Sequence, residues 1–167
     1  MAKRVAMAGI FVSLALIFSY VESLIPFNFG IPGIKLGLAN VVIVTGLYLM
    51  KLPDVCLIAL IRIFVSGLLF GNMMSLIYSL SGGILSLIVM ILLKRTNKFS
   101  VIGVSISGAV CHNIGQIAAA IVVTGVPVIV YYLPGLMGVG IITGAVMGII
   151  ASHILVILTR SIKISNM

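Results

Sequence analysis

The sequence has very few charged residues. Of its 167 residues only 7% are Asp, Glu, Lys or Arg, whereas 62% are hydrophobic, and the mean hydropathy is +1.42. A soluble domain carries roughly 25% charged residues, which keep its surface compatible with water. The shortage of charge therefore excludes a soluble globular protein. It predicts an all-α integral membrane protein with one transmembrane domain over residues 1–167.

Acidic residues are almost absent, since Glu22 and Asp54 are the only two. They cannot supply paired catalytic carboxylates, a Ser/His/Asp triad or the aspartate-rich motifs that hold Mg²⁺ against a diphosphate. The sequence also lacks a Gly-rich phosphate loop ending in Lys-Ser/Thr, so this chain cannot be its own ATP motor. We expect the chain not to be an enzyme and to hold no cofactor of its own.

Cysteine and histidine, the usual metal ligands, are also scarce. Cys56 and Cys111 both lie in apolar runs, which argues against a disulfide framework or a zinc site. His112 and His153 lie in separate apolar stretches without a nearby Cys or carboxylate, so we expect no metal site. Their predicted depths differ by about two helical turns or more, which also argues against bis-histidine haem ligation.

What the sequence does contain is six long apolar stretches. They are continuously apolar rather than alternating, which favours transmembrane helices over barrel strands. A spanning helix needs about 20 residues, so the second and third stretches are short. A seventh span over residues 126–133 would be too short, and its Tyr and Pro residues are more typical of an outer interfacial loop. The predicted spans are residues 5–25, 36–50, 55–70, 73–93, 101–123 and 136–159.

The net charge of +8 is distributed unevenly along these spans. When the chain is threaded from a cytoplasmic N-terminus, eight of its ten cations fall on one side of the membrane. The positive-inside rule predicts this pattern for an even number of spans with both termini cytoplasmic. The charge therefore indicates orientation, and we expect no nucleic-acid partner. The eight cations are Lys3, Arg4, Lys51, Lys94, Arg95, Lys98, Arg160 and Lys163.

Small residues recur at four-residue spacing in three of the predicted spans, where they let helix backbones approach closely. We interpret these stripes as ordinary packing within the bundle. They are Ser75, Ser79 and Gly83 in the fourth span, Gly103, Ser107, Cys111, Gly115 and Ala119 in the fifth, and Gly140, Gly144, Gly148 and Ser152 in the sixth.

The first span carries two further pairs of small residues, Ala2 with Ala6 and Gly9 with Ser13. They could pack inside the monomer, or they could present a smooth face to another membrane subunit. The sequence alone favours packing inside the monomer.

Polar side chains at membrane depth are candidates for function because each is costly without a partner. Asn40 lies about 16 Å from the cytoplasmic boundary at 1.5 Å per helical residue. His112 lies at a similar depth, with Asn113 beside it and Gln116 one turn further on. For Asn40 alone we favour a structural hydrogen bond between helices. For His112, Asn113 and Gln116 together, ligand binding and structural hydrogen bonding both stay open.

Arg62 and Lys35 are the two cations that orientation does not explain. Arg62 lies about two turns inside the third span. It could snorkel to the headgroups, or face inward and bind an anionic ligand. An ion pair with Asp54 is conceivable but not close on the helix face. Lys35 belongs to an outer loop rich in Pro, Gly and Phe, where it could attract an anion or anchor the loop at the interface.

Several stretches resemble the Gx transporter family, whose members carry the label heptaprenyl diphosphate synthase component I. The resemblance extends over nearly the whole chain, and its most specific parts are the motifs at 35–40 and 112–116. The stretches that carry it are Ile-Pro-Gly-Ile-Lys-Leu-Gly-Leu-Ala-Asn at 31–40, Arg62 with Gly67 and Phe70-Gly71, Ser-Gly-Gly at 81–83, and Gly-Ala-Val-Cys-His-Asn-Ile-Gly-Gln at 108–116.

That family is similar in turn to the S-components of energy-coupling-factor (ECF) transporters. The resemblance implies a six-helix S-component-like bundle in the bacterial cytoplasmic membrane that captures a vitamin-like molecule from outside. It also implies a transmembrane coupling subunit and two cytoplasmic ATPases, which would use the ATP. In S-components the small residues of the first helix dock on the coupling subunit, a role that here would fall to Ala2, Ala6, Gly9 and Ser13.

Our main functional hypothesis is therefore the substrate-binding subunit of such an importer, taking up a small anionic molecule that is vitamin-like or a quinone or isoprenoid precursor. One alternative is a non-catalytic membrane partner of a polyprenyl diphosphate synthase, and another is a membrane redox subunit handling quinone or flavin. The candidate substrate-binding residues are Lys35, Asn40, Arg62, His112, Asn113 and Gln116.

Overall fold

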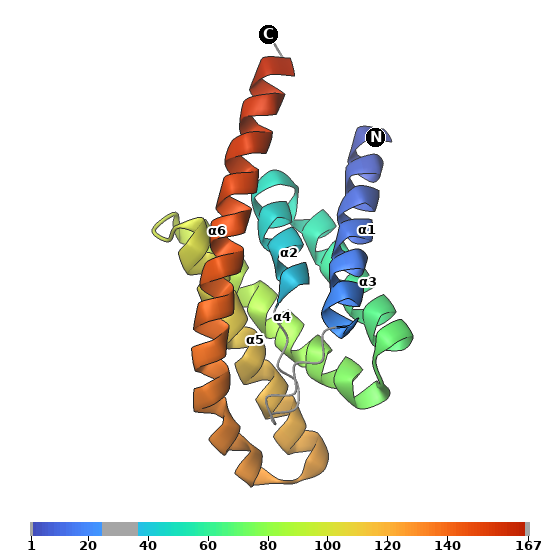
Figure 1. The fold of residues 1–167 in the computed structure, drawn as a ribbon, viewed down its shortest axis with the longest axis vertical. Coiled ribbons are helices and arrows are strands. Elements are labelled where there is room, and N and C mark those ends of the chain that lie inside the picture. Colours follow the sequence, from blue (N-terminus) through green and yellow to red (C-terminus); the bar gives the residue numbers. More distant parts are fainter. Residues whose placement is uncertain (1, 25–36, 166–167) are drawn as a thin grey trace.

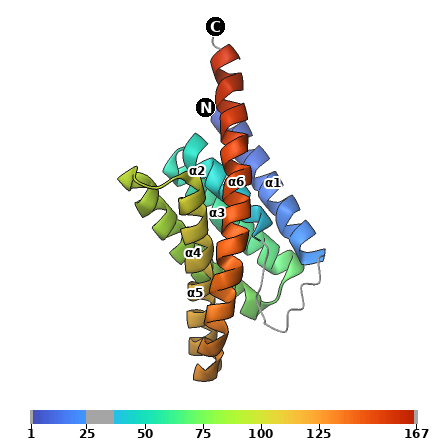
Figure 2. The same ribbon diagram turned by 60° about the vertical axis from the view of Figure 1, so that its left-hand side comes forward.

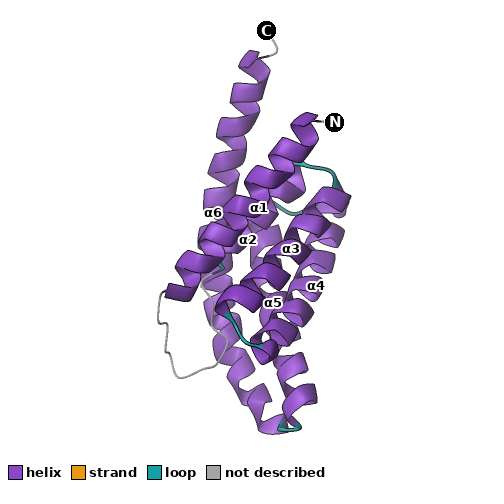
Figure 3. Cartoon of the chain, turned by 90° about the vertical axis from the view of Figure 1, so that its right-hand side faces the viewer, coloured by secondary structure: helices purple, strands orange, loops and turns teal. Residues whose placement is uncertain are grey.

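The computed structural model describes residues 2–24 and 37–165, with side chains up to Arg160. Within these ranges every regular element is a helix, as Figure 3 shows, and the predicted all-α fold is confirmed. The elements are α1 (Ala2–Leu24), α2 (Leu38–Leu49), α3 (Leu52–Phe70), α4 (Met73–Thr96), α5 (Val101–Thr124), the 3₁₀ helix η1 (Pro127–Tyr132) and α6 (Leu133–Ser165).

Among the described residues, five helical segments are long and apolar enough to cross a membrane, namely α1, α3, α4, α5 and the segment that contains η1 and α6. The remaining helix, α2, is apolar but has only 12 residues. At 1.5 Å per residue it is about 18 Å long, well short of a hydrocarbon core of about 30 Å. The apolar composition of the chain and its long apolar helices are typical of a multi-pass membrane protein.

Local signals explain where the helices begin. α4 begins with a capping box, in which the backbone N–H of Ser75 donates to Asn72 Oδ1 over 2.8 Å and that of Asn72 donates to Ser75 Oγ over 3.1 Å. Ser100 caps the start of α5, and its hydroxyl accepts a hydrogen bond from the Gly103 N–H. Side chains of this kind satisfy donors that the first helical turn leaves unpaired.

The last part of the chain departs from the sequence prediction. Residues 127–132 form a 3₁₀ helix rather than a loop, although Tyr131 is 80% exposed, as expected for an interfacial residue. α6 begins at Leu133, because Pro134 occupies the first turn, where its missing N–H costs no hydrogen bond. The helix therefore extends beyond the predicted sixth span of 136–159 at both ends.

The most extensive contacts between the six described α-helices close a ring in the order α1, α3, α4, α5, α6, α2 and back to α1, and α2 also contacts α3 and α5. Figure 1 shows both described ends of the chain at one end of the bundle, which we call the terminus end, and the opposite end is the far end. α2 is the most enclosed helix, with eight of its 12 residues buried. α6 projects beyond the other helices at the terminus end (Figure 2).

Glycines set the close contacts around α5. A Cβ atom added to Gly144 of α6 would lie 2.7 Å from Ile106 Cα, and one added to Gly148 would lie 2.8 Å from Ile102 Cα. The predicted stripe on α6 is thus confirmed as a packing surface. Its contacts on α5, however, are at Ile102 and Ile106 rather than on the predicted stripe of small residues.

The contact between α4 and α5 also uses glycine. A Cβ atom on Gly115 would lie 2.8 Å from Gly82 Cα, and the Ser81 hydroxyl donates to the Gly115 carbonyl over 3.0 Å. The predicted stripe on α4 is wrong as a single packing face, because Gly83 lies against Ile63 of α3 whereas Ser75 and Ser79 line a cavity.

An apolar core lies toward the terminus end of the ring. Nine buried residues from α2 to α6 form it, and they include no polar side chain. They are Ile43, Val44, Leu47, Val55, Ile58, Ala59, Met90, Val104 and Ala151.

Candidate functional site

A polar cavity of about 480 Å³ lies toward the far end, between α1, α3 and α4. Most of the side chains around it carry hydroxyl, amide or charged groups, although the helices that supply them are apolar overall. Such groups are costly at membrane depth unless a partner or a ligand satisfies them. The lining residues are Ser19, Glu22, Ser23, Arg62, Ser66, Gly67, Phe70, Gly71, Asn72, Ser75 and Ser79.

Arg62 points into the bundle from α3. Its Nε donates to Ser19 Oγ of α1 over 3.1 Å, and the side chain lines the cavity. The structure therefore places it facing inward rather than snorkelling to the headgroups. The conceivable pair with Asp54 is not formed, because Asp54 accepts hydrogen bonds from Arg4 Nε and Nη2 over 2.8 and 2.6 Å.

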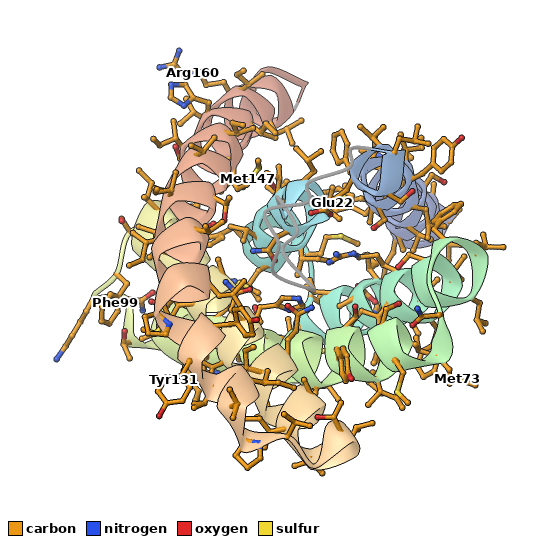
Figure 4. All side chains as sticks on the ribbon, turned by 60° about the horizontal axis from the view of Figure 1, so that its bottom comes forward. Glu22, Met73, Phe99, Tyr131, Met147 and Arg160 are labelled. Atoms are coloured by element: carbon orange, nitrogen blue, oxygen red, sulfur yellow. The ribbon has the colours of Figure 1, made fainter. Side chains whose placement is uncertain are left out.

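Glu22 lies on the same inner face of α1 as Ser19, one turn further along, and is only 8% exposed. Its Oε1 accepts a hydrogen bond of 2.6 Å from the backbone N–H of Gly37. Gly37 precedes α2 with a φ of 74°, a left-handed conformation that favours glycine. Figure 4 shows Glu22 on the side of α1 that faces the interior of the ring.

Glu22 and Arg62 form the charged part of the site. The Glu22 carboxylate is near enough to interact electrostatically with the Arg62 guanidinium. Our sequence reasoning missed Glu22, because it placed this residue at the outer membrane boundary. The signal was nevertheless available, since a carboxylate inside an apolar helix is a functional candidate by default.

A second cavity of about 50 Å³ adjoins the first and shares Glu22 and Arg62 with it. Five helices of the ring contribute to its wall, and it brings together four of the six predicted binding residues. Its lining consists of Glu22, Gly37, Asn40, Arg62, Ala109, His112, Asn113 and Thr143.

The polar residues of α5 divide between binding surface and helix packing. Asn113 lines the small cavity, but its Nδ2 also donates to the Leu136 carbonyl of α6 over 2.7 Å. Gln116 is 7% exposed and packs against α4, where its Cγ lies 2.8 Å from the position of a Cβ on Gly82. Gln116 therefore belongs to the contact between α4 and α5, and it does not line either cavity. Lys35 lies outside the described residues.

The small residues near the start of α1 remain on the surface. Ala2, Ala6, Gly9 and Ser13 are all exposed, and a Cβ atom on Gly9 would meet no atom within 4 Å. The packing inside the monomer that we favoured from the sequence is therefore wrong for these four residues, although other residues of α1 pack against α2 and α3. Whether another subunit covers the face stays a prediction.

The arrangement can recognise a small molecule by hydrogen bonding. Arg62 supplies guanidinium donors, Glu22 supplies carboxylate acceptors, and the serine hydroxyls can do either. Over residues 2–24 and 37–165, no group of three or more His, Cys, Asp or Glu side chains is placed to hold a metal ion.

A profile of the family described as heptaprenyl diphosphate synthase component I matches residues 11–154, a range that includes every lining residue of both cavities. Neither a curated protein nor a solved structure matches the chain. On this match the chain belongs to the heptaprenyl diphosphate synthase component I family.

Proposed function

We propose that this protein is a substrate-binding membrane subunit that captures a small polar molecule in the far-end cavity. The observation that supports it best is a cavity of about 480 Å³ with Arg62 and Glu22 in its wall, inside a bundle of apolar helices. Small-molecule sites typically have volumes of about 300–1,000 Å³ with a few well-placed polar groups.

The side chains suggest the chemistry of the ligand. A guanidinium matches the planar, two-oxygen geometry of a carboxylate or phosphate, so Arg62 suits an anionic group. The nearby Glu22 carboxylate can also accept a hydrogen bond from a donor, or pair with a cation, on the same ligand. A vitamin-like molecule, or a quinone or isoprenoid precursor that carries both kinds of group, would satisfy the pair.

In this proposal the terminus end faces the cytoplasm of a bacterial cell and the far-end cavity faces outward. The described cations Lys51, Lys94 and Arg95 lie at the junctions of helices near the terminus end, as the positive-inside rule requires of a cytoplasmic face. A ligand arriving from outside would then reach Arg62 and Glu22 from the far end.

The finer form of the proposal is an importer of the ECF type. The exposed small residues of α1, centred on Gly9, would let a helix of the coupling subunit approach closely. Two cytoplasmic ATPases bound to that coupling subunit would supply the energy.

A second candidate is a membrane component that works with a heptaprenyl diphosphate synthase. The description of the matched family favours it. In that case a polyprenyl synthase, rather than a coupling subunit, would be the partner.

Mass spectrometry of small molecules released from the purified protein tests the binding role. The intact chain is purified in detergent, denatured, and its extract compared with that of an unrelated membrane protein prepared in the same way. We expect one small polar molecule, with both an anionic and a donor group, to be enriched. An extract that contains nothing beyond lipid and detergent would contradict a substrate-binding subunit.

Co-expression distinguishes the two candidate partners. We expect the tagged chain to capture a coupling subunit with its ATPases, and Gly9→Leu to abolish capture because the bulky side chain blocks the face of α1. Gly138→Leu is the matched control, since a Cβ on Gly138 also meets no atom within 4 Å. Capture of a polyprenyl synthase instead, unaffected by Gly9→Leu, would favour the second candidate and reject the importer.

A further inference from the structure

A separate recess of about 280 Å³ lies at the terminus end, between the junction of α2 and α3 and the last turn of α4. Its two kinds of lining differ sharply. One kind is aliphatic, and the other is polar, with two adjacent cations and an amide. The lining residues are Leu47, Leu52, Ile91, Lys94, Arg95 and Asn97.

Lys94 is held in place at this recess. Its Nζ donates to the carbonyl of Leu47 and lies 5.1 Å from the centroid of the Tyr48 ring. The Leu47 carbonyl is in the last turn of α2, where helical carbonyls lack an internal partner and the helix end carries partial negative charge. These contacts position the ammonium group at the wall of the recess.

The cations of the recess have no acidic partner within the described part of the chain. Asp54 is engaged by Arg4, and Glu22 lies toward the far end, where it binds the Gly37 N–H. The only salt bridge that the described residues form is the one between Arg4 and Asp54. The positive charge of Lys94 and Arg95 is therefore available to an anion that this chain does not supply.

We propose that this recess binds the phosphate or diphosphate head of a lipid. Lys94 and Arg95 would hold the head through charge-assisted hydrogen bonds, which are about twice as strong as neutral ones. The aliphatic side chains of Leu47, Leu52 and Ile91 would contact the first carbons of the tail. Basic pockets between transmembrane helices bind phospholipid headgroups in this way. The site lies at the opposite end of the bundle from the proposed substrate cavity and does not depend on it.

Native mass spectrometry with three matched probes tests the proposal on the purified full-length chain. Farnesyl diphosphate carries both tail and head, farnesol carries the tail alone, and inorganic diphosphate carries the head alone. We expect farnesyl diphosphate to bind at least about tenfold more tightly than either of the others, because each lacks one half of the contacts.

Charge removal locates the site. Arg95→Gln should weaken farnesyl diphosphate binding about tenfold, the loss expected for one charge-assisted contact. Lys98→Gln removes an exposed charge that does not line the recess, so its affinity should stay near that of the wild type. Lys94→Gln should act like Arg95→Gln. Lys94→Gln also removes the contact of Lys94 to α2. If Lys94→Gln fails to fold for that reason, Arg95→Gln decides the test.

Competition by phosphatidylglycerol identifies the source of the lipid. Displacement at equal concentration would show a site for ordinary membrane phospholipid, and resistance would show a preference for prenyl diphosphates; both outcomes support the proposal. It would be overturned if no probe binds, if farnesol or inorganic diphosphate binds as tightly as farnesyl diphosphate, or if Lys98→Gln weakens binding as much as Arg95→Gln.

Discussion

The two ends of this helical ring are built on opposite principles, although the same helices run through both. Toward the terminus end, nine buried apolar side chains form one core that includes no polar side chain. Toward the far end, two cavities are lined by hydroxyl, amide, imidazole and charged groups. α3 shows the change within one turn, since Ile58 is 2% exposed in the core and Arg62 points into both cavities.

This difference separates the residues that hold the bundle together from those available for a ligand. Lipid supplies no hydrophobic drive for helix association, so stability depends on close packing and on hydrogen bonds between helices. The apolar core at the terminus end provides this packing. The polar far end contains two cavities that packed side chains could have filled. We therefore propose that a ligand binds there.

The largest effect on stability should come from a change in the apolar core at the terminus end. Ile58→Ala should lower the free energy of unfolding by about 2–4 kcal/mol, because it removes packing contacts and leaves a void. Thermal unfolding in detergent measures this. Its neighbour Leu57 is 56% exposed and faces away from the core, so Leu57→Ala should change little. Equal losses in the two variants would show that the core is not where the structure places it.

A smaller loss should come from the glycine contact between α4 and α5. Gly115→Ala should destabilise the protein by about 1–3 kcal/mol, because the added methyl group meets backbone atoms of α4 that cannot move aside cheaply. Gly138→Ala provides the control, since its methyl group would enter open space. A neutral Gly115→Ala would mean that the helices are further apart than described.

The polar end should respond in the opposite way. Glu22→Gln keeps a carbonyl oxygen that can accept the Gly37 hydrogen bond, so the free energy of unfolding should change by less than about 1 kcal/mol. Affinity for the molecule identified in the purified protein should nevertheless fall about tenfold, because a charge-assisted contact is lost. Calorimetry and thermal unfolding on the same sample measure both quantities. A variant that is strongly destabilised but binds normally would reverse the assignment of the two ends.

The smallest effect should come from the ion pair between Arg4 and Asp54, which joins the starts of α1 and α3. Asp54→Asn should lower the melting temperature less than Ile58→Ala or Gly115→Ala, and the difference should shrink as salt is added, because exposed ion pairs are screened. Lys3→Gln, which removes an exposed charge near the start of α1, serves as the comparison. A large loss that is insensitive to salt would contradict this view of the pair.

The helices themselves could be predicted from the sequence because their apolar runs end at charges, prolines and glycines. α3 and α4 end or begin at Phe70 and Met73 as expected. The same approach failed at residues 127–132, where Pro127 and Pro134 suggested a loop. Pro is compatible with the first turn of a helix, so the chain continues as a 3₁₀ helix into α6.

The site could be predicted only in part, because helical spacing does not tell which neighbour a face will meet. Asn40, Arg62, His112 and Asn113 were identified by their polarity, and they do surround one cavity. Ser75 and Ser79 were assigned to packing because their size and spacing are the same as those of true packing residues. The partner of Asp54 was 50 positions away in the sequence, so only the ring of helices could reveal it.

Retention of a small molecule by cavity variants tests the central claim most directly. The wild type, Arg62→Gln and Arg160→Gln are purified in parallel, and the molecules that each releases on denaturation are quantified by mass spectrometry. Arg160 lies exposed near the end of α6, away from both cavities (Figure 4). We predict that the wild type and Arg160→Gln retain the same polar molecule in similar amounts and that Arg62→Gln loses it. Equal retention by all three, at equal yields of folded protein, would contradict the assignment of the far-end cavity as the binding site.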